Sequence, residues 1–239
     1  MLSGRAFSCP IVLVLLTSGC RARAPAEEEY RVARTSQAAP ELLAAGDEPW
    51  GSAQRIVWGP EAYPTAFRAL WNDTGLFIRF DVTDADPWHT MTGRDDRLWQ
   101  EEVVEIFLQP AGLEREYGEL EINPGNVACD VWVKPDGHRF DRSWNLEGLE
   151  SRVAIRRDGA GSVTGWSALA FLPWRGFATA APRATLPPHP GDRWRFNLFR
   201  IERPGGKTQP ERDALFLAWS PTGQPTFHVP AAFRRLELR

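Results

Sequence analysis

The stretch LFIRFDV at residues 76–82 decides the fold class, because apolar side chains recur in it at every second position. This alternation is typical of a β-strand that turns one face to a core. Residues 66–71 form a second such run, and Asn72-Asp73-Thr74-Gly75 between the two runs favours a hairpin turn. The sequence therefore predicts an antiparallel pair of strands. One face of the second strand carries Leu76, Ile78, Phe80 and Val82, and the other carries Phe77, Arg79 and Asp81.

The same pattern continues along the chain, with turn residues between the runs. No window of twelve residues keeps the 3.6-residue period of a helix, although residues 174–178 fit one short helical turn. Many short strands without long helices do not fit a parallel α/β fold, so we expect an all-β fold, an antiparallel β-sandwich of jelly-roll type. Residues 179–191, which contain four prolines, are expected to form a long surface loop. The further predicted strands are residues 103–108, 118–122, 127–133, 153–157, 166–171, 193–201, 215–219 and 234–238.

Charge and cysteine content exclude several classes of protein. The 28 Lys and Arg residues against 31 Asp and Glu give a net charge of −3, so there is no electrostatic basis for nucleic-acid binding. The three cysteines form no spaced cluster with histidine, which excludes a structural zinc site. Cys129 lies in an alternating apolar run and is expected to be a small buried side chain without a disulfide partner.

Residues 1–20, MLSGRAFSCPIVLVLLTSGC, follow the plan of a secretory signal, with an apolar core at residues 11–16 and small residues after it. Cys20 makes this segment resemble a bacterial lipoprotein signal that is cleaved before the cysteine. Thr17 departs from that pattern, because an aliphatic residue is usual there. The resemblance implies a signal peptide at residues 1–19, a lipid on Cys20 and a lipoprotein held at a membrane of the bacterial cell envelope. The alternative is an ordinary signal with a chance cysteine.

Two further segments are expected after the signal. Residues 20–46 are rich in Ala, Pro, Arg and Glu without an apolar period, and we expect the lipidated cysteine and a flexible spacer there. Residues 47–239 suit one all-β domain. The apolar core of the signal is too short to cross a bilayer and no other window approaches the required length, so no membrane-spanning helix is expected after cleavage.

The segment DDRLWQEEVVEIFL at residues 95–108 places a tryptophan and several carboxylates just ahead of a strand. With a period of two, Glu101 and Glu105 point to one face of that strand and Glu102 to the other. Side chains four residues apart on a strand stand roughly 13 Å from each other, which is too far for the carboxylate pair of a glycosidase. We therefore expect no catalysis, and interpret these residues as solvated charge at a sheet edge.

The order of motifs from here to the C-terminus resembles the family 9 carbohydrate-binding modules and their DOMON-like relatives. The resemblance covers nearly all of residues 47–239, and it rests on the ordered set because no single motif is specific. The motifs are Asp81 and Asp84 at a strand end, Trp99 and an acidic linker before the strand at 104–108, Tyr117 followed by Glu121-Ile122-Asn123-Pro124, Trp166 with Pro173-Trp174, FNLFR at 196–200, WSP at 219–221 and HVPAAF at 228–233.

The resemblance implies non-catalytic carbohydrate binding, with a sugar ring held between two aromatic side chains and an association with polysaccharide breakdown. Trp99 matches one aromatic position, and Phe227 matches the other, where a tryptophan is usual. Asn123 matches a polar binding position, and Glu121 stands where an arginine occurs in the family. His228, from the closing motif, completes the expected carbohydrate site.

Three other roles stay open. Asp81, Asp84 and Asp86 offer oxygen ligands for a structural calcium, which relatives carry, and the alternative is a loop of solvated aspartates. Some DOMON-like relatives bind haem, so histidine axial ligands are a second hypothesis. A protein partner bound through the same aromatic face is a third. The four histidines are His89, His138, His189 and His228.

Tryptophan is unusually frequent, with 11 Trp against 3 Tyr. Most of these rings fall in strand patterns and are expected to fill the core of a wide sandwich. Trp99 is the first exception, because it lies where a loop meets a strand. The expected core members include Trp71, Trp166, Trp194 and Trp219, whereas the sequence leaves Trp132 and Trp144 open between core and site.

Overall fold

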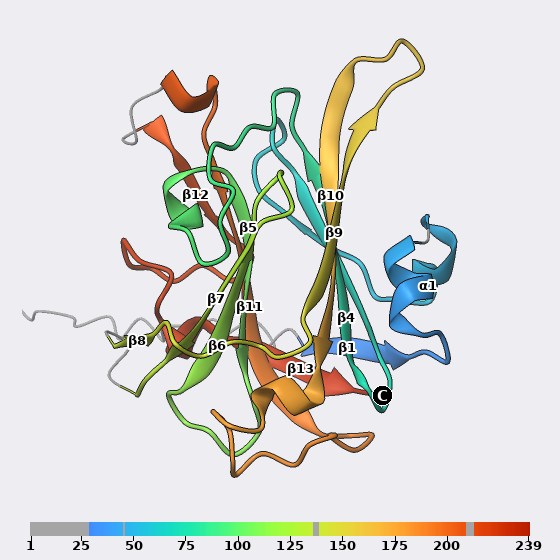
Figure 1. The fold of residues 1–239 in the computed structure, drawn as a ribbon, viewed down its shortest axis with the longest axis vertical. Coiled ribbons are helices and arrows are strands. Elements are labelled where there is room, and N and C mark those ends of the chain that lie inside the picture. The colour runs from blue at the N-terminus through green and yellow to red at the C-terminus, as the bar shows by residue number, and fades with distance from the viewer. Residues whose placement is uncertain (1–28, 45, 136–138, 209–212) are drawn as a thin grey trace, which may run out of the picture.

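The computed structural model describes residues 29–44, 46–135, 139–208 and 213–239, and it shows two β-sheets packed face to face (Figure 1). The strands of the first sheet are β5 (Val103–Gln109), β6 (Tyr117–Ile122), β7 (Ala128–Val133), β8 (Phe140–Asp141), β11 (Arg193–Glu202), β12 (Leu215–Ala218) and β13 (Arg234–Leu238). Their order is β8-β7-β6-β5-β11-β13, and β12 also pairs with β11.

The strands of the second sheet are β2 (Ile56–Trp58), β3 (Thr65–Trp71), β4 (Gly75–Thr83), β9 (Glu150–Arg157) and β10 (Val163–Pro173). Their order is β3-β4-β10-β9, and β2 pairs with β3. The helices are short: α1 (Ala39–Ala44) and the 3-10 helices η1 (Glu48–Trp50), η2 (Leu98–Gln100), η3 (Trp174–Phe177), η4 (Gly206–Thr208) and η6 (Pro230–Ala232). The predicted β-sandwich is therefore confirmed.

Strand β1 (Glu29–Arg34) joins the two sheets. It pairs in parallel with β13 through its first four residues and with β3 through its last two. Tyr30 and Val32 on this strand are fully buried. The predicted domain boundary at residue 47 is therefore wrong, and the predicted spacer does not hold for residues 29–44. Residues 20–28 (with Cys20) and 45 of that segment, and the signal at residues 1–19, lie outside the described residues.

The period of two that the sequence shows in β4 has the expected consequence for packing. Leu76, Ile78, Phe80 and Val82 point between the sheets, where they meet Val104, Ile106 and Leu108 of β5. Phe77 on the opposite face packs with Leu42 of α1, which lies outside the second sheet (Figure 1). Burying one such side chain contributes roughly 1.5–3 kcal/mol, so the alternation holds the layers together.

All ten strands predicted from the sequence are present, and the expected turn at residues 174–178 is η3. The strands β1, β2 and β8 were not predicted. The described pairs are antiparallel as expected, except the two that β1 makes. Trp71, Trp166 and Trp194 are buried and Trp219 packs half-buried against the core. Trp132 and Trp144 also belong to the core, with ring centres 5.3 Å apart.

Candidate functional site

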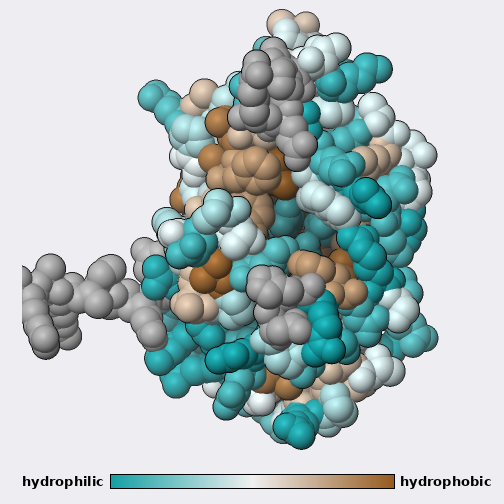
Figure 2. Space-filling view, turned by 90° about the vertical axis from the view of Figure 1, so that its left-hand side faces the viewer, coloured by the Kyte–Doolittle hydropathy of each residue, from teal (hydrophilic) through white to brown (hydrophobic). Residues whose placement is uncertain are grey.

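A groove of about 1130 Å³ lies on the outer face of the first sheet. Alternate residues of β5, β6 and β11 face outward there, because their neighbours fill the core on the inner side. Figure 2 looks onto this face and shows apolar residues around a hollow. The loop that contains residues 221–228 closes one side of the groove, and β8 supplies part of another.

Three glutamates form the floor of the groove. Glu105 of β5 and Glu119 and Glu121 of β6 are only 2%, 6% and 1% exposed, although all three line the groove. Glu105 and Glu121 are direct cross-strand partners. Like charges opposite each other destabilise a sheet, so this pairing is a cost that the fold carries at this position.

The floor glutamates are held toward their protonated forms. Burial raises the pKa of Glu105 well above its ordinary value, and the charge of Glu119 adds to this shift. Burial also raises the pKa of Glu121, with further contributions from the charges of Glu105 and Glu119. The pKa of Glu119 is raised by burial to about 7, although a hydrogen bond with Glu121 and the charge of Arg142 oppose the shift. The floor therefore retains protons at a pH where exposed glutamates have lost theirs.

Aromatic side chains form the walls. Trp99 comes from η2, and Phe227 comes from the loop before η6. One face of Phe227 stacks on the buried Phe199 with a centroid distance of 4.2 Å, which fixes the orientation of the ring. Two more rings line the groove and are unusually exposed, Phe216 by 57% and Phe140 by 42%. Exposed aromatic rings around a hollow are typical of a binding surface.

Two basic side chains enter the groove from different parts of the chain. The guanidinium carbon of Arg142 lies 4.7 Å from the centre of the Trp99 ring. His228 stacks on Phe107 at 5.2 Å, and its Nδ1 lies 2.9 Å from the Tyr117 hydroxyl oxygen. These contacts place one cation against the wall and one imidazole beside the floor.

Four of the five residues expected in the carbohydrate site come together in this groove, namely Trp99, Phe227, Glu121 and His228. Asn123 does not line it. The Asn123 side chain is fully buried and accepts hydrogen bonds from the backbone N–H groups of Gly125 and Val127 while donating to the Met91 carbonyl. Its polar atoms hold the turn between β6 and β7. The expected place of Asn123 in the carbohydrate site is therefore corrected, because the side chain does not line the groove.

The sequence did not identify most of the residues that line the groove, among them Glu119 and Arg142, and it misassigned Glu105. Glu119 lies two residues before Glu121 on the same strand and therefore points to the same face, so the sequence pattern could have identified it. Arg142 gives no local signal, because only the tertiary fold brings it to Trp99. Glu105 was interpreted as solvated charge at a sheet edge, yet β5 is a central strand and the side chain is buried.

Glu101 and Glu102 are also buried, and they lie away from the groove floor. Glu101 accepts hydrogen bonds from the backbone N–H groups of Thr90 and Met91, so it orders the loop before η2. Glu102 accepts a bond from the Trp88 N–H at 3.0 Å and faces the inner side of the sheet. Because Glu101, Glu102 and Glu105 have separate surroundings, no two of them form a catalytic pair.

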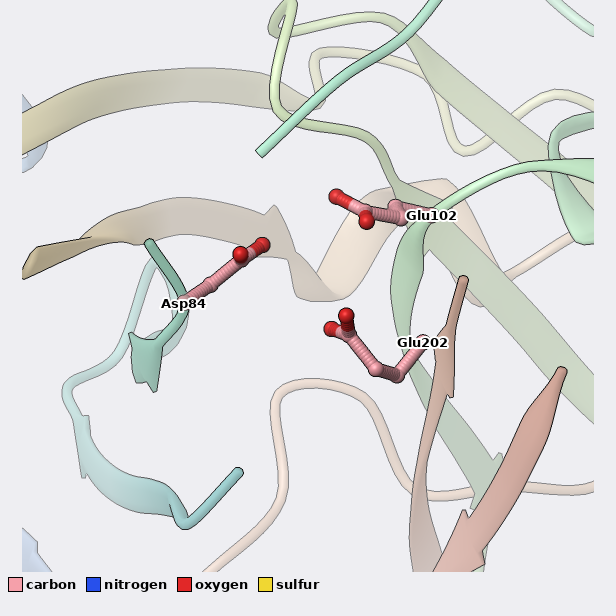
Figure 3. Close-up of side chains that lie close together, drawn as sticks. All are labelled: Asp84, Glu102 and Glu202. Atoms are coloured by element: carbon pink, nitrogen blue, oxygen red, sulfur yellow. The ribbon is translucent and has the colours of Figure 1, made fainter. Parts of the chain in front are cut away.

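A second acidic group lies at the inner side of the first sheet. Asp84 after β4, Glu102 before β5 and Glu202 at the end of β11 converge, with one oxygen of each within 4.8 Å of the others (Figure 3). Burial, with the charges of its two neighbours, raises the pKa of Glu102 to about 10, and burial raises that of Glu202 to about 7. Buried carboxylates without enough positive charge around them are expected to bind a proton or a cation.

Of Asp81, Asp84 and Asp86, for which the sequence leaves a calcium site open, only Asp84 belongs to this group. Asp81 is engaged by Arg79, Arg68 and Ser167 on the outer face of the second sheet, and Asp86 is exposed. The carboxylates of Asp84, Glu102 and Glu202 suit a hard cation, and Asp84 Oδ2 accepts no hydrogen bond from the described residues. Arg200 competes with a cation for this group, because its guanidinium is paired with Glu202 and lies 3.8 Å from Asp84 Oδ2.

The histidines give no support to a haem pocket within the described residues. His228 is the single histidine among the residues that line the groove. His189 is exposed and lies near Asp192, and His89 is exposed as well. His138 lies outside the described part of the chain.

The sequence profile described as Carbohydrate-binding family 9 matches residues 37–238. The chain belongs to carbohydrate-binding family 9. This match covers the whole sandwich apart from the strand β1, and it confirms the resemblance drawn from the motifs. No curated protein sequence matches the chain at a significant level.

Solved structures agree with the family assignment. A protein from Bacteroides uniformis with a provisional carbohydrate-binding assignment superposes with a TM-score of 0.72 at 18% identity, covering 89% of this chain and 99% of that one. A family 9 module from Caldicellulosiruptor kristjanssonii in complex with cellotriose gives 0.60 at 12% identity, covering 89% and 94%. The same kind of module with glucose gives 0.59 at 13% identity, covering 89% and 96%. At these identities the similarity establishes the fold.

No helix in the described part of the chain has the length and apolar character needed to span a bilayer.

Proposed function

We propose that the groove on the outer face of the first sheet binds carbohydrate, with the sugar ring stacked on Trp99 or Phe227. The observation that carries the proposal is the meeting of Trp99, Phe227, Glu121 and His228 in one groove, although three separate segments of the chain supply these residues. The structures of family 9 modules with cellotriose and glucose support the same kind of ligand.

The chemistry of the groove suits a pyranose. Axial C–H groups of the sugar carry partial positive charge and pack on the negative face of an aromatic ring. The hydroxyl groups at the ring edge need a few placed acceptors, which Glu105, Glu119 and Glu121 supply at the floor. Apolar walls and a polar floor therefore match the two sides of the ligand.

The proposed role is binding without catalysis. In support of this, the floor glutamates are packed among one another, and burial raises the pKa of Glu105 and Glu121 alike. The protein would then hold a sugar while an associated enzyme acts on the polysaccharide. The lipoprotein signal read from residues 1–20 adds the proposal that this binding takes place at a membrane of the bacterial cell envelope.

Calorimetric titration of the protein with glucose, cellobiose and cellotriose tests the proposal. We expect a binding isotherm at millimolar ligand or below, and a loss of heat in Trp99→Ala. Ile155→Ala serves as the control, because Ile155 is an exposed apolar side chain on β9 of the other sheet. The absence of any sugar response, or an equal loss in the control, would contradict the assignment of the groove.

A further inference from the structure

The groove floor holds more carboxyl groups than the basic side chains of the lining can neutralise. Three glutamates stand against one guanidinium, Arg142, and one imidazole, His228. His228 Nδ1 lies 3.9 Å from Glu119 Oε2, which is close enough for attraction when the ring is charged. With all three carboxyl groups ionised, one negative charge would be left over. Burial opposes that ionisation, and a cation in the groove favours it.

Two carboxyl oxygens at the floor also lack donors. Among the described residues, Glu119 Oε2 and Glu121 Oε2 are buried and accept no hydrogen bond. Both side chains line the groove, so a ligand that enters it lies against the two carboxyl groups to which these buried oxygens belong. A buried charged acceptor without a donor costs free energy, and two things remove this cost: a proton shared between the carboxyl groups, or donors brought by a ligand.

The wall of the groove already accepts a cation. Arg142 stacks over the Trp99 ring, and a guanidinium in this position gains about 0.5–1 kcal/mol at an exposed site. The charge of Arg142 also opposes the rise that burial causes in the pKa of Glu119 and Glu121. A positive group near Trp99 is therefore stabilised by the ring and by the floor together.

We propose that the preferred ligand of the groove is a sugar that carries a protonated amino group, such as a 2-amino-2-deoxyhexose. This inference rests on the proposed carbohydrate binding and narrows its ligand class. An ammonium group donates three hydrogen bonds, and its positive charge favours the ionised form of the floor carboxyl groups. A hydroxyl group donates one bond and brings no charge, and an N-acetyl group removes the charge from the nitrogen.

The test is a titration of the full chain at pH 6.5 with D-glucosamine, D-glucose and N-acetyl-D-glucosamine, which differ at one position of the ring. We expect glucosamine to bind at least tenfold more tightly than the two neutral sugars. In Glu121→Gln, which keeps the size of the side chain and removes a carboxyl group that can ionise, the preference should fall to about threefold or less. Glu150→Gln is the matched control, because Glu150 is an exposed glutamate of β9 on the other sheet.

The outcomes separate this inference from the proposed function. Glucose binding without a preference for glucosamine overturns the inference and leaves carbohydrate binding intact. No binding of any of the three sugars contradicts both. An equal loss of preference in Glu150→Gln also overturns the inference, because the effect would then come from overall charge. Thermal unfolding of each variant, with Glu119→Gln as a second floor variant, confirms that the protein tested is folded.

Discussion

Arg142 lies over Trp99, with its guanidinium carbon 4.7 Å from the ring centre. The residue occupies a surface on which a sugar is proposed to stack, and its charge acts on the floor glutamates. A cationic ligand and Arg142 therefore compete for the same surroundings. This relationship links the wall and the floor of the groove and gives the first prediction.

Replacing Arg142 with alanine should raise the affinity for glucosamine several-fold relative to glucose. The reason is that the variant removes a cation that competes with the ligand for the Trp99 ring and for the floor carboxyl groups. Titration of both sugars into the variant and the parent protein measures the ratio of the two affinities. A ratio that falls, or stays unchanged, would show that Arg142 does not compete with the ligand.

Trp99 and Phe227 should differ in what they contribute to stability. Trp99→Ala removes a half-exposed ring, and we expect a loss of roughly 0.5–1.5 kcal/mol in sugar binding with a smaller effect on folding. Phe227→Ala also removes a ring that stacks on Phe199, so its free energy of unfolding should fall by roughly 1–2 kcal/mol, below the cost of a fully buried ring. Urea unfolding and calorimetry, run on both variants, check this contrast; equal loss of stability in the two would contradict it.

Stability should fall as the pH rises from about 5 to about 8. Glu119 has a pKa raised to about 7 in the folded protein by burial, so the folded state binds more protons than the unfolded state in this window. Stability is therefore greatest below the pKa of the unfolded side chain and is lost as the pH passes through the folded value. Urea unfolding at pH 5 and pH 8 measures the difference. Glu119→Gln should reduce it, and an unchanged slope in that variant would contradict the assignment to Glu119.

Calcium should stabilise the protein through Asp84, Glu102 and Glu202. A hundredfold excess of ion over its Kd adds about 2.7 kcal/mol, which corresponds to a rise of roughly 5–10 °C in Tm for a domain of this size. The rise should be larger at pH 8 than at pH 5, because the ion competes with protons for Glu102 and Glu202. Asp84→Asn should abolish it and Asp81→Asn should keep it. A Tm that does not respond to calcium would show that Arg200 and bound protons satisfy the group.

Tyr30 tests the corrected domain boundary. Its hydroxyl donates to the Gln54 carbonyl at 2.6 Å and accepts from the Ala69 N–H at 2.7 Å. Tyr30→Phe leaves that buried N–H without an acceptor, and we expect a loss of about 1–3 kcal/mol in the free energy of unfolding. Urea denaturation measures the loss, and no change would mean that residues 29–34 contribute little to the folded domain.

The sequence predicted the sandwich because most strands show their alternation over five or more residues. It missed β1, since only Tyr30 and Val32 alternate in a segment of Ala, Pro, Arg and Glu, and its partners lie far along the chain. Pattern reasoning finds a strand by its own side chains, and β1 is specified mainly by the two edges that it fills.

The site was predictable where the order of motifs identified a residue, as for Trp99 and Phe227. It was not predictable where the role depends on contacts distant in the sequence. Asn123 satisfies a local turn instead of a ligand, and Arg142 reaches Trp99 only in the folded chain. The group of Asp84, Glu102 and Glu202 is likewise formed from three strand ends that no local spacing connects.

The position of β1 also determines how the protein bears mechanical load. A force applied to the chain before Glu29 acts along β1, and the backbone hydrogen bonds to β13 and β3 lie across that direction. These bonds are loaded in shear and must break together, whereas a strand peeled from one end gives way one bond at a time. A domain tethered at this end and holding a polysaccharide in its groove would thus resist being pulled open along its point of attachment.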